Sequence, residues 1–285
     1  MSINQLRNRW GVEIDASEDL KTIQQHLLSD QLVVVRNSTF ANYTKFSDFV
    51  HNIGYMLGEC CGRSVDETGV NTSPIVQVAN PNQNDVPSGG FSYMGKGSGY
   101  WHQDGGDEHA GLHYYTALYA HNVPPVGGDT MFTNLKLAWN DLSDTYKNLL
   151  RNLNCVSISR PLRMWTQQAM QDCGPEFNLL MSKKEIVKCP LVAIDTLGEE
   201  TLMFSPRSVF RFEGMYEEES TPILDFLTNH CTRPEYTFRH QWQPNDLILW
   251  LNQTHLHYGV YDYTHTDRRL WQVKFHLTEQ DLEVL

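Results

Sequence analysis

Residues 236–277 form the most strand-rich part of the chain and read YTFRHQWQPNDLILWLNQTHLHYGVYDYTHTDRRLWQVKFHL. Four segments of this stretch are rich in β-branched and aromatic residues, and QPND and DYTHTD between them have the composition of turns. Segments of this kind, bounded by Pro, Asn and Asp, predict β-strands. The expected strands are YTFRHQW, DLILWLN, HLHYGVY and RLWQVKFHL. Consecutive strands near the C-terminus favour a β-sandwich or barrel as the core.

The rest of the chain adds helices in front of this region and strands in the middle. Helices are predicted from apolar residues at helical spacing, with Ser17 and Asn134 as N-caps and Gly54 as a C-terminal stop. The expected helices are 17–30, 42–54, 134–153 and 220–234, and the further expected strands are 31–37, 111–123 and 129–134. We find no repeat or linker, so residues 1–285 are expected to form one α+β domain.

Charge and composition exclude several classes of protein. The net charge of -12 disfavours a nucleic-acid partner, because phosphate binding requires a basic face. The chain has neither an apolar leader nor a run of about 18 apolar residues, so neither export nor a membrane span is expected, and we expect a cytoplasmic protein. The cysteines are scattered without a C-x-x-C pair and are expected to be reduced: Cys60, Cys61, Cys155, Cys173, Cys189 and Cys231.

A long irregular segment precedes the most polar motif of the chain. Residues 79–100 are rich in Gly, Pro, Asn and Ser. Long loops inside a compact domain are usually functional or disordered. Since this segment leads directly into WHQD at 101–104, it is expected to be a mobile lid beside a site.

The motif GYWHQDGGD, residues 99–107, carries the candidate metal ligands. His102 and Asp104 are two residues apart, so on a strand they point to the same face. Two His and one carboxylate on one face make the triad of non-haem Fe(II) oxygenases. An H-x-D motif by itself is weak evidence for a metal site. His255 and His257 share a face of a later predicted strand, and either could complete the triad.

Four blocks in order resemble the taurine/2,4-dichlorophenoxyacetate dioxygenase family. They are WHQD (101–104), PPVGGDT (124–130), TRPEYTFRHQWQPNDLILWLN (232–252), and HYGVYDY followed by RR (257–269). The resemblance implies a double-stranded β-helix, or jelly roll, with flanking helices. It also implies Fe(II), the cosubstrate 2-oxoglutarate and O2, with His102, Asp104 and His257 as metal ligands. His255 is then a structural neighbour.

The cosubstrate carries a second carboxylate that needs a hydroxyl donor and a cation. By resemblance, Thr130 at the end of GGDT is the donor, and one residue of the Arg268–Arg269 pair supplies the guanidinium. Strand parity places Arg269 on the apolar face with Trp271 and Val273, which we expect to face inward. The alternation of side chains along the strand therefore favours Arg269. The number of residues that separates the arginine from the second histidine ligand in the family, counted here from His257, instead gives Arg268.

We expect a small-molecule substrate, and the sequence disfavours some classes of substrate without identifying one. The family's sulfonate-binding Arg falls at Gln272 or Val273, so a sulfonate is disfavoured, and Asp104 leaves no vacant chloride position of the kind halogenases need. The short chain and WHQDG look most like the isonitrile-forming oxygenases acting on tyrosine-derived isonitriles; hydroxylation of another small carboxylate or amino acid is the alternative. Candidate substrate contacts are Lys96, Arg163, Arg207, Arg211, Phe91, Tyr93 and Tyr100.

Two rivals of a different class use the same residues. A metal-dependent hydrolase would activate water with Zn(II) and would consume no 2-oxoglutarate. A non-catalytic jelly roll would bind iron weakly and turn over no cosubstrate. The sequence does not fix the oligomeric state, and a homo-oligomer stays open.

Overall fold

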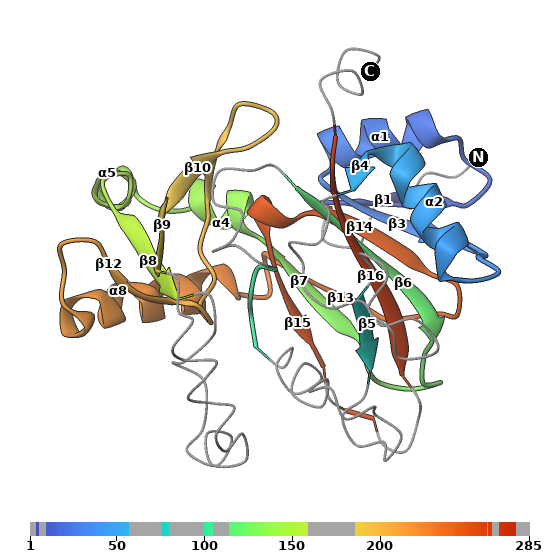
Figure 1. Cartoon of the computed structure of the whole chain (residues 1–285). Helices are drawn as coiled ribbons and strands as arrows, with labels where there is room; N and C mark the ends of the chain where they lie inside the picture. Colours follow the sequence, from blue (N-terminus) through green and yellow to red (C-terminus); the bar gives the residue numbers. More distant parts are fainter. Residues whose placement is uncertain are drawn as a thin grey trace.

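The computed structural model describes residues 4–5, 10–56, 76–79, 100–104, 114–158, 186–260, 262–263 and 268–277. Helices and sheets are both present, as predicted (Figure 1). The largest sheet has eight strands in the order β1-β2-β3-β14-β6-β16-β4, with β5 also paired to β16. Its strands are β1 (Asn4–Gln5), β2 (Val12–Asp15), β3 (Leu32–Arg36), β4 (Tyr55–Met56), β5 (Val76–Ala79), β6 (Tyr115–Asn122), β14 (Leu247–Leu251) and β16 (Arg269–His276).

A three-stranded sheet, β13-β7-β15, faces the larger one. It contains β7 (Thr130–Asn134), β13 (Thr237–His240) and β15 (His255–Gly259). All four strands predicted in 236–277 form, and they alternate between the sheets: β13 and β15 join the small sheet, β14 and β16 the large one. Apolar side chains fill the space between, with the ring of Phe132 on β7 packed 5.1 Å from that of Trp250 on β14.

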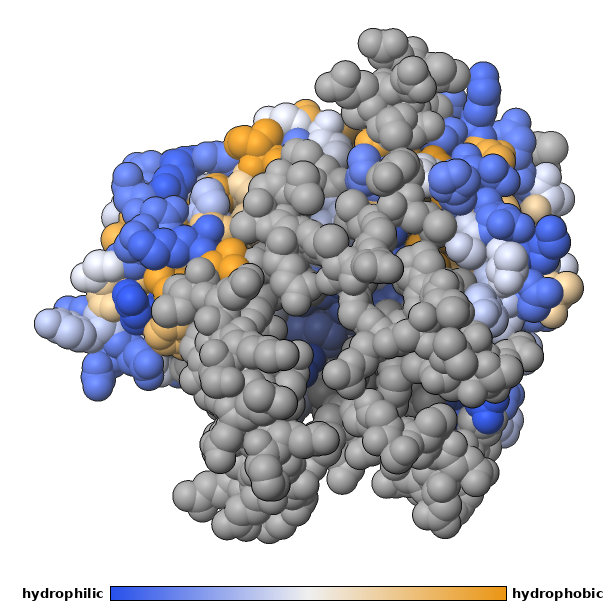
Figure 2. Space-filling model, in the orientation of Figure 1, coloured by the Kyte–Doolittle hydropathy of each residue, from blue (hydrophilic) through white to orange (hydrophobic). Residues whose placement is uncertain are grey.

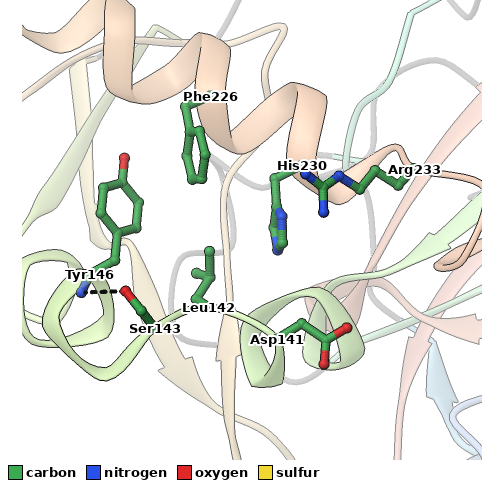
Figure 3. A pocket seen from close by; sticks show the side chains of 7 residues that line it. All are labelled: Asp141, Leu142, Ser143, Tyr146, Phe226, His230 and Arg233. Carbon is green, nitrogen blue, oxygen red and sulfur yellow. Dashed lines mark hydrogen bonds between the residues drawn. The ribbon is translucent and has the colours of Figure 1, made fainter.

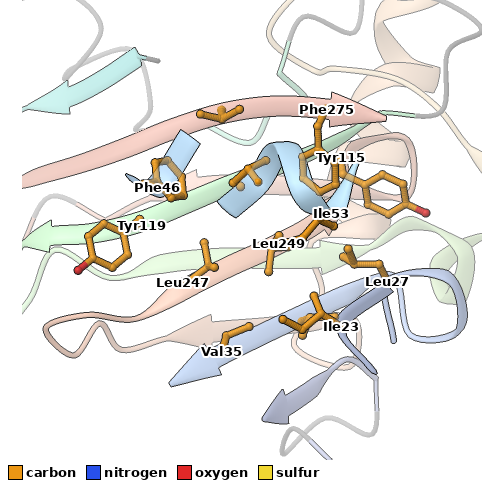
Figure 4. Packing of buried hydrophobic residues seen from close by; sticks show 14 of the residues in the cluster. Ile23, Leu27, Val35, Phe46, Ile53, Tyr115, Tyr119, Leu247, Leu249 and Phe275 are labelled. Atoms are coloured by element: carbon orange, nitrogen blue, oxygen red, sulfur yellow. The ribbon is translucent and has the colours of Figure 1, made fainter. Parts of the chain in front are cut away.

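Helices α1 (Leu20–Ser29) and α2 (Tyr43–Ile53) cover the outer face of the large sheet. Their apolar stripes, including Ile23, Leu27 and Phe46, pack on side chains of β3, β6, β14 and β16 (Figure 4). The predicted cap of the first helix is wrong by two residues, since the side chain of Asp19 and not of Ser17 accepts from the N–H of Thr22. The side chain of Asp15 accepts from the N–H of Ser17 in the preceding turn.

Because β14 is buried on both faces, its side chains contribute strongly to stability. Leu249, at the centre of this strand, is fully buried in the core under α1 and α2. The substitution Leu249→Ala is expected to lower the free energy of unfolding by about 3 kcal/mol, as buried Leu-to-Ala changes generally do. Urea unfolding measures this. In the control Leu149→Ala, at a side chain 47% exposed, the loss should stay below about 1 kcal/mol.

A second lobe holds the remaining elements around its own apolar core. The predicted helix 134–153 is two helices, because Ser143 starts a new one by accepting from the N–H of Tyr146. The side chain of Asn134 caps the first, as predicted. The lobe comprises α4 (Leu135–Asn140), α5 (Asp144–Leu150), β8 (Asn154–Ile158), β9 (Ile186–Pro190), β10 (Val192–Ile194), β11 (Glu200–Leu202), β12 (Val209–Phe212) and α8 (Glu217–Cys231).

The surface of this lobe carries several exposed apolar side chains. Leu137 on α4 and Ile194 on β10 are 37% and 52% exposed, and hydrophobic patches appear on this side of the molecule in Figure 2. None of the helices in the described ranges has the length and apolar character needed to cross a bilayer.

Some predictions lie outside the described residues. They include most of the expected lid, residues 80–99, and the candidate contacts Lys96, Arg163, Phe91 and Tyr93. Three of the six cysteines, Cys155, Cys189 and Cys231, lie in the described part of the chain, and their thiols are buried.

Candidate metal centre

The structure brings His102, Asp104 and His257 together, although more than 150 residues separate the first from the last. One nitrogen of each imidazole and one carboxylate oxygen lie within 4.8 Å of one another. Asp104 Oδ1 is 3.9 Å from His102 Nε2 and 3.7 Å from His257 Nε2. Two atoms that each lie about 2.1 Å from one ion are separated by at most about 4.2 Å. These two distances therefore fit ligands around a shared ion, and they are too long for hydrogen bonds.

Backbone pairing sets this arrangement. The N–H of His102 donates to the carbonyl of His257 over 3.0 Å, and the N–H of His257 donates back over 2.9 Å. This antiparallel bridge extends the small sheet beyond β15. The imidazole rings consequently lie side by side, with centroids 4.1 Å apart.

The intervening Gln103 points away from the centre and anchors the motif. Its side-chain amide donates to the carbonyls of Asn252 and Gln253 over 3.0 and 2.7 Å. Asn252 in turn holds the backbone of Asp104 at both ends: its Oδ1 accepts from the N–H, and its Nδ2 donates to the carbonyl. His102 and Asp104 thus share a face, as their spacing predicts. The anchoring role of Asn252 was not predicted, although it lies in one of the quoted blocks.

Each histidine ring is fixed by its surroundings. His102 Nδ1 lies 2.7 Å from the carbonyl of Tyr100, so this nitrogen carries the proton and Nε2 offers its lone pair toward Asp104. The ring of His257 packs against Trp250, with centroids 5.1 Å apart, and stacks on Phe132. Both rings are therefore held with Nε2 toward the carboxylate.

Electrostatics keeps the three groups in the state that binds a metal. Burial lowers the pKa of His102 to about 3, and the charges of His257 and Arg207 act in the same direction. Burial also lowers the pKa of His257. For Asp104 burial raises the pKa, but His257, Lys274, His102 and Arg207 together lower it by more, and the pKa ends below its usual value. Neutral imidazoles and an ionised carboxylate at neutral pH are the protonation states that metal ligands need.

His255, the other candidate of the H-x-H pair, lies outside this cluster. Its ring is fully buried, contacts Trp10 at 5.3 Å between centroids, and has Nδ1 3.0 Å from the carbonyl of Leu251. Burial lowers its pKa to about 4. The structure thus places His255 as a packed neighbour, as the resemblance implied.

Thr130 lies at the start of β7, opposite Gly259 of β15. It is buried, and its Oγ1 accepts a hydrogen bond from the indole Nε1 of Trp242 over 3.0 Å. Because a hydroxyl has one proton, which this contact does not use, Thr130 keeps its capacity to donate.

Arg268 and Arg269 fall on opposite sides of the strand. Arg268 is 6% exposed and its Nε donates to the carbonyl of Gly128, two residues before Thr130. Gly128 has φ +71°, and a Cβ there would come within 3.1 Å of Arg268 Cδ, so a glycine lets the arginine lie against the turn.

Strand parity does not separate the two arginines. The apolar face that it shares with Trp271 and Val273 packs under α1 and α2. The alternate face carries Leu270, in the core between the sheets, and Gln272, which reaches Asp104. Since β16 is buried on both faces, apolar character does not distinguish the site side. The geometry favours Arg268, the residue obtained by counting from His257.

The remaining candidates at described positions are Arg207, Arg211 and Tyr100. Arg207 follows Ser205, whose hydroxyl accepts from the N–H of Gln103 over 3.4 Å, and the positive charge of Arg207 acts on all three groups of the cluster. Arg211 lies on β12, where it contacts the ring of Phe210. Tyr100 contributes its carbonyl to His102.

A separate pocket opens between the α4–α5 connection and α8 (Figure 3). It has a volume of about 350 Å³ and includes Tyr146, Phe226, His230 and Arg233 in its lining. None of its lining residues belongs to the His-Asp-His cluster or to β7, β15 or β16. We therefore assign the chemistry to the cluster.

Comparison with known proteins finds a family model that matches nearly the whole chain and curated relatives that match about half of it. A family model described as taurine catabolism dioxygenase TauD, TfdA family, matches residues 3–274. The chain is 27% identical over 170 residues to the alpha-ketoglutarate-dependent 2,4-dichlorophenoxyacetate dioxygenase of Burkholderia sp. (strain RASC), covering 58% of this chain and 54% of that protein. It is 28% identical over 147 residues to the alkylsulfatase of Acinetobacter baylyi, covering 50% and 45%. The matched regions span about half the length of these curated relatives.

A solved structure shares the fold over nearly the full length. The crystal structure of AAD-2 in complex with Mn(II) and N-oxalylglycine superposes with a TM-score of 0.78, 19% identity and coverage of 98% of both chains. The relatives named above do not include an isonitrile-forming oxygenase, so that narrower prediction receives no support from them.

Proposed function

Because the chain belongs to the TauD/TfdA family of dioxygenases, we propose that it is an Fe(II)- and 2-oxoglutarate-dependent dioxygenase that oxidises a C–H bond of a small organic anion. The observation that carries the proposal is the cluster of His102, Asp104 and His257, with ligand atoms within 4.8 Å. Two imidazoles and one carboxylate are the donor set of non-haem Fe(II) oxygenases and leave three positions open. A double-stranded β-helix formed by the two facing sheets is the fold that we assign to this domain.

The family uses Fe(II), 2-oxoglutarate and O2. His102, Asp104 and His257 would hold the iron, which when bound supplies oxidation of the substrate coupled to conversion of 2-oxoglutarate to succinate and CO2. The protein contributes fixed ligand directions: the carbonyl of Tyr100 orients His102, and Trp250 and Phe132 hold the ring of His257. Packing around these rings leaves His102 and His257 each only 7% exposed.

Thr130 and Arg268 would bind the far carboxylate of 2-oxoglutarate. The Nε of Arg268 donates to the carbonyl of Gly128, which precedes Thr130 by two residues in the chain. The Nε of Arg268 is taken by the Gly128 carbonyl, so its terminal nitrogens would meet the carboxylate. The indole of Trp242 occupies one lone pair of Thr130 Oγ1, which leaves the hydroxyl proton to be donated to the same carboxylate.

Arg207 would supply the counter-charge for the substrate. Its positive charge lowers the pKa of all three cluster residues. Ser205, two residues before it, accepts a hydrogen bond from the N–H of Gln103. The two curated relatives are named for a carboxylate, 2,4-dichlorophenoxyacetate, and for alkyl sulfates. A small anion of one of these two kinds is the substrate class that this arrangement suits.

Succinate release with a panel of anions tests the proposed function. The protein is assayed with Fe(II), 2-oxoglutarate and O2 in the presence of 2,4-dichlorophenoxyacetate, hexyl sulfate, taurine or L-tyrosine, each beside its uncharged analogue where one exists. At least one carboxylate or sulfate ester should stimulate succinate release, and its uncharged analogue should not. Turnover with Zn(II) and no 2-oxoglutarate consumption would instead establish the rival hydrolase.

For the most active anion, Arg207→Ala is expected to raise the substrate KM by about 10- to 100-fold, because it removes one charge-assisted hydrogen bond to that anion. The KM for 2-oxoglutarate should stay within about twofold, because Arg207 is not assigned to that molecule. Arg211→Ala on β12 is the matched control and should leave both constants unchanged. Equal substrate KM values in the Arg207 and Arg211 variants would remove Arg207 from the substrate site.

A further inference from the structure

Gln272 on β16 contacts the carboxylate of the candidate metal ligand Asp104. Its Nε2 donates to Asp104 Oδ2 over 2.6 Å, and the side chain is buried with 8% of its surface exposed. The other oxygen, Oδ1, is the one that faces Nε2 of both histidines. The two carboxylate oxygens therefore have different partners before any ion binds.

The backbone contacts of Asp104 do not by themselves produce this arrangement. Asn252 fixes the N–H and the carbonyl of Asp104, but the carboxylate can still rotate about its own side-chain bonds. A donor on Oδ2 stops this rotation, since turning the carboxylate would break a buried hydrogen bond. It also occupies Oδ2, which a metal could otherwise bind together with Oδ1.

The amide is suited to this position because it is neutral. An arginine there would form an ion pair with Asp104, and its charge would compete with the cation that the carboxylate serves. Gln272 stands four positions after Arg268, where the family's taurine pattern has a sulfonate-binding arginine. In this chain Gln272 at that position donates to the metal ligand Asp104, so a different cationic side chain must bind the substrate anion.

We propose that Gln272 is a positioning residue that holds Asp104 as a ligand through one oxygen, keeping one more coordination position open for the reactants. The inference rests on the metal site of the proposed function and adds a residue to it. Partners of this kind orient metal ligands, and their loss generally costs about 10- to 100-fold in metal affinity or activity.

Metal titration of the purified protein tests this role. Gln272→Met keeps the length of the side chain and removes the N–H donors, and Gln272→Leu is a second variant in case the first does not fold. Gln241→Leu, at an exposed glutamine, is the matched control. The Kd for Mn(II) is measured in each protein, and the visible spectrum of the Co(II) form reports how many ligands surround the ion.

In the Gln272 variants the Kd for Mn(II) is expected to rise by about 10- to 100-fold, and the Co(II) bands should shift in position and intensity as Oδ2 joins the coordination. The control should match the wild type. A Gln272 variant with wild-type thermal stability, a Kd within twofold and an unchanged Co(II) spectrum would overturn the inference. A wild-type protein that binds neither Mn(II) nor Co(II) would instead overturn the proposed function itself.

Discussion

The variants His102→Ala and Asp104→Ala are expected to lose succinate formation while keeping the fold. Each change removes one of three ligand groups around the candidate ion. Because a bound metal contributes several kcal/mol to the reaction, losing it should lower turnover by at least about 1,000-fold. Succinate release under saturating Fe(II) and 2-oxoglutarate measures the effect.

Folding of these variants is expected to survive for a structural reason. The His102–His257 bridge uses backbone groups, and Asn252 binds the backbone of Asp104, so alanine at either position keeps these contacts. His255→Gln is the matched control, since His255 lies on the same strand as His257 but outside the cluster. Retained turnover in both ligand variants, or loss only in the His255 variant, would show that the metal centre is misplaced.

The second large effect is expected for Arg268→Ala, which should raise the KM for 2-oxoglutarate by about 100-fold, or about 2.7 kcal/mol. Arg268 reaches the turn that precedes Thr130, and its planar guanidinium matches a carboxylate. Arg268→Lys keeps the charge without the planar group and should give an intermediate KM. Initial rates at varied 2-oxoglutarate measure all of these values.

Arg269→Ala serves as the matched comparison, one residue away on the other side of β16. Its KM for 2-oxoglutarate should stay within about threefold of the wild type, because the face of Arg269 packs toward α1 and α2. A large effect of Arg269→Ala with a small effect of Arg268→Ala would show that the parity prediction had chosen the correct arginine after all.

The strands of residues 236–277 were predictable because each is short and rich in β-branched, aromatic or aliphatic residues, and is separated from the next by turn residues or by the 3-10 helix Asn252–Thr254. All four form, and the spacing of His102 and Asp104 correctly places both side chains on one face. The break between α4 and α5 was not predictable, since Leu142, Tyr146 and Leu149 continue the helical spacing across it. Ser143 starts the second helix there, and serine suits both a helix cap and a helix surface.

Contacts between residues of the site that lie far apart in the sequence could not be predicted. The hydrogen bond from Gln272 to Asp104 joins residues 168 positions apart, and no local pattern encodes it. Strand parity does not decide between Arg268 and Arg269, because β16 is buried on both faces and apolar residues mark neither side as the inner one. The spacing from His257 points to Arg268 independently of polarity, because it relies on the distance between two motifs.

In the proposed function, His102, Asp104 and His257 would hold an iron ion to which 2-oxoglutarate binds. The most direct measurement is the visible spectrum of the anaerobic protein with Fe(II) before and after 2-oxoglutarate is added. A weak charge-transfer band should appear on addition, should be absent in His102→Ala and Asp104→Ala, and should require more 2-oxoglutarate in Arg268→Ala. A folded wild-type protein that contains one Fe(II) and shows no such band at saturating 2-oxoglutarate would contradict the assignment.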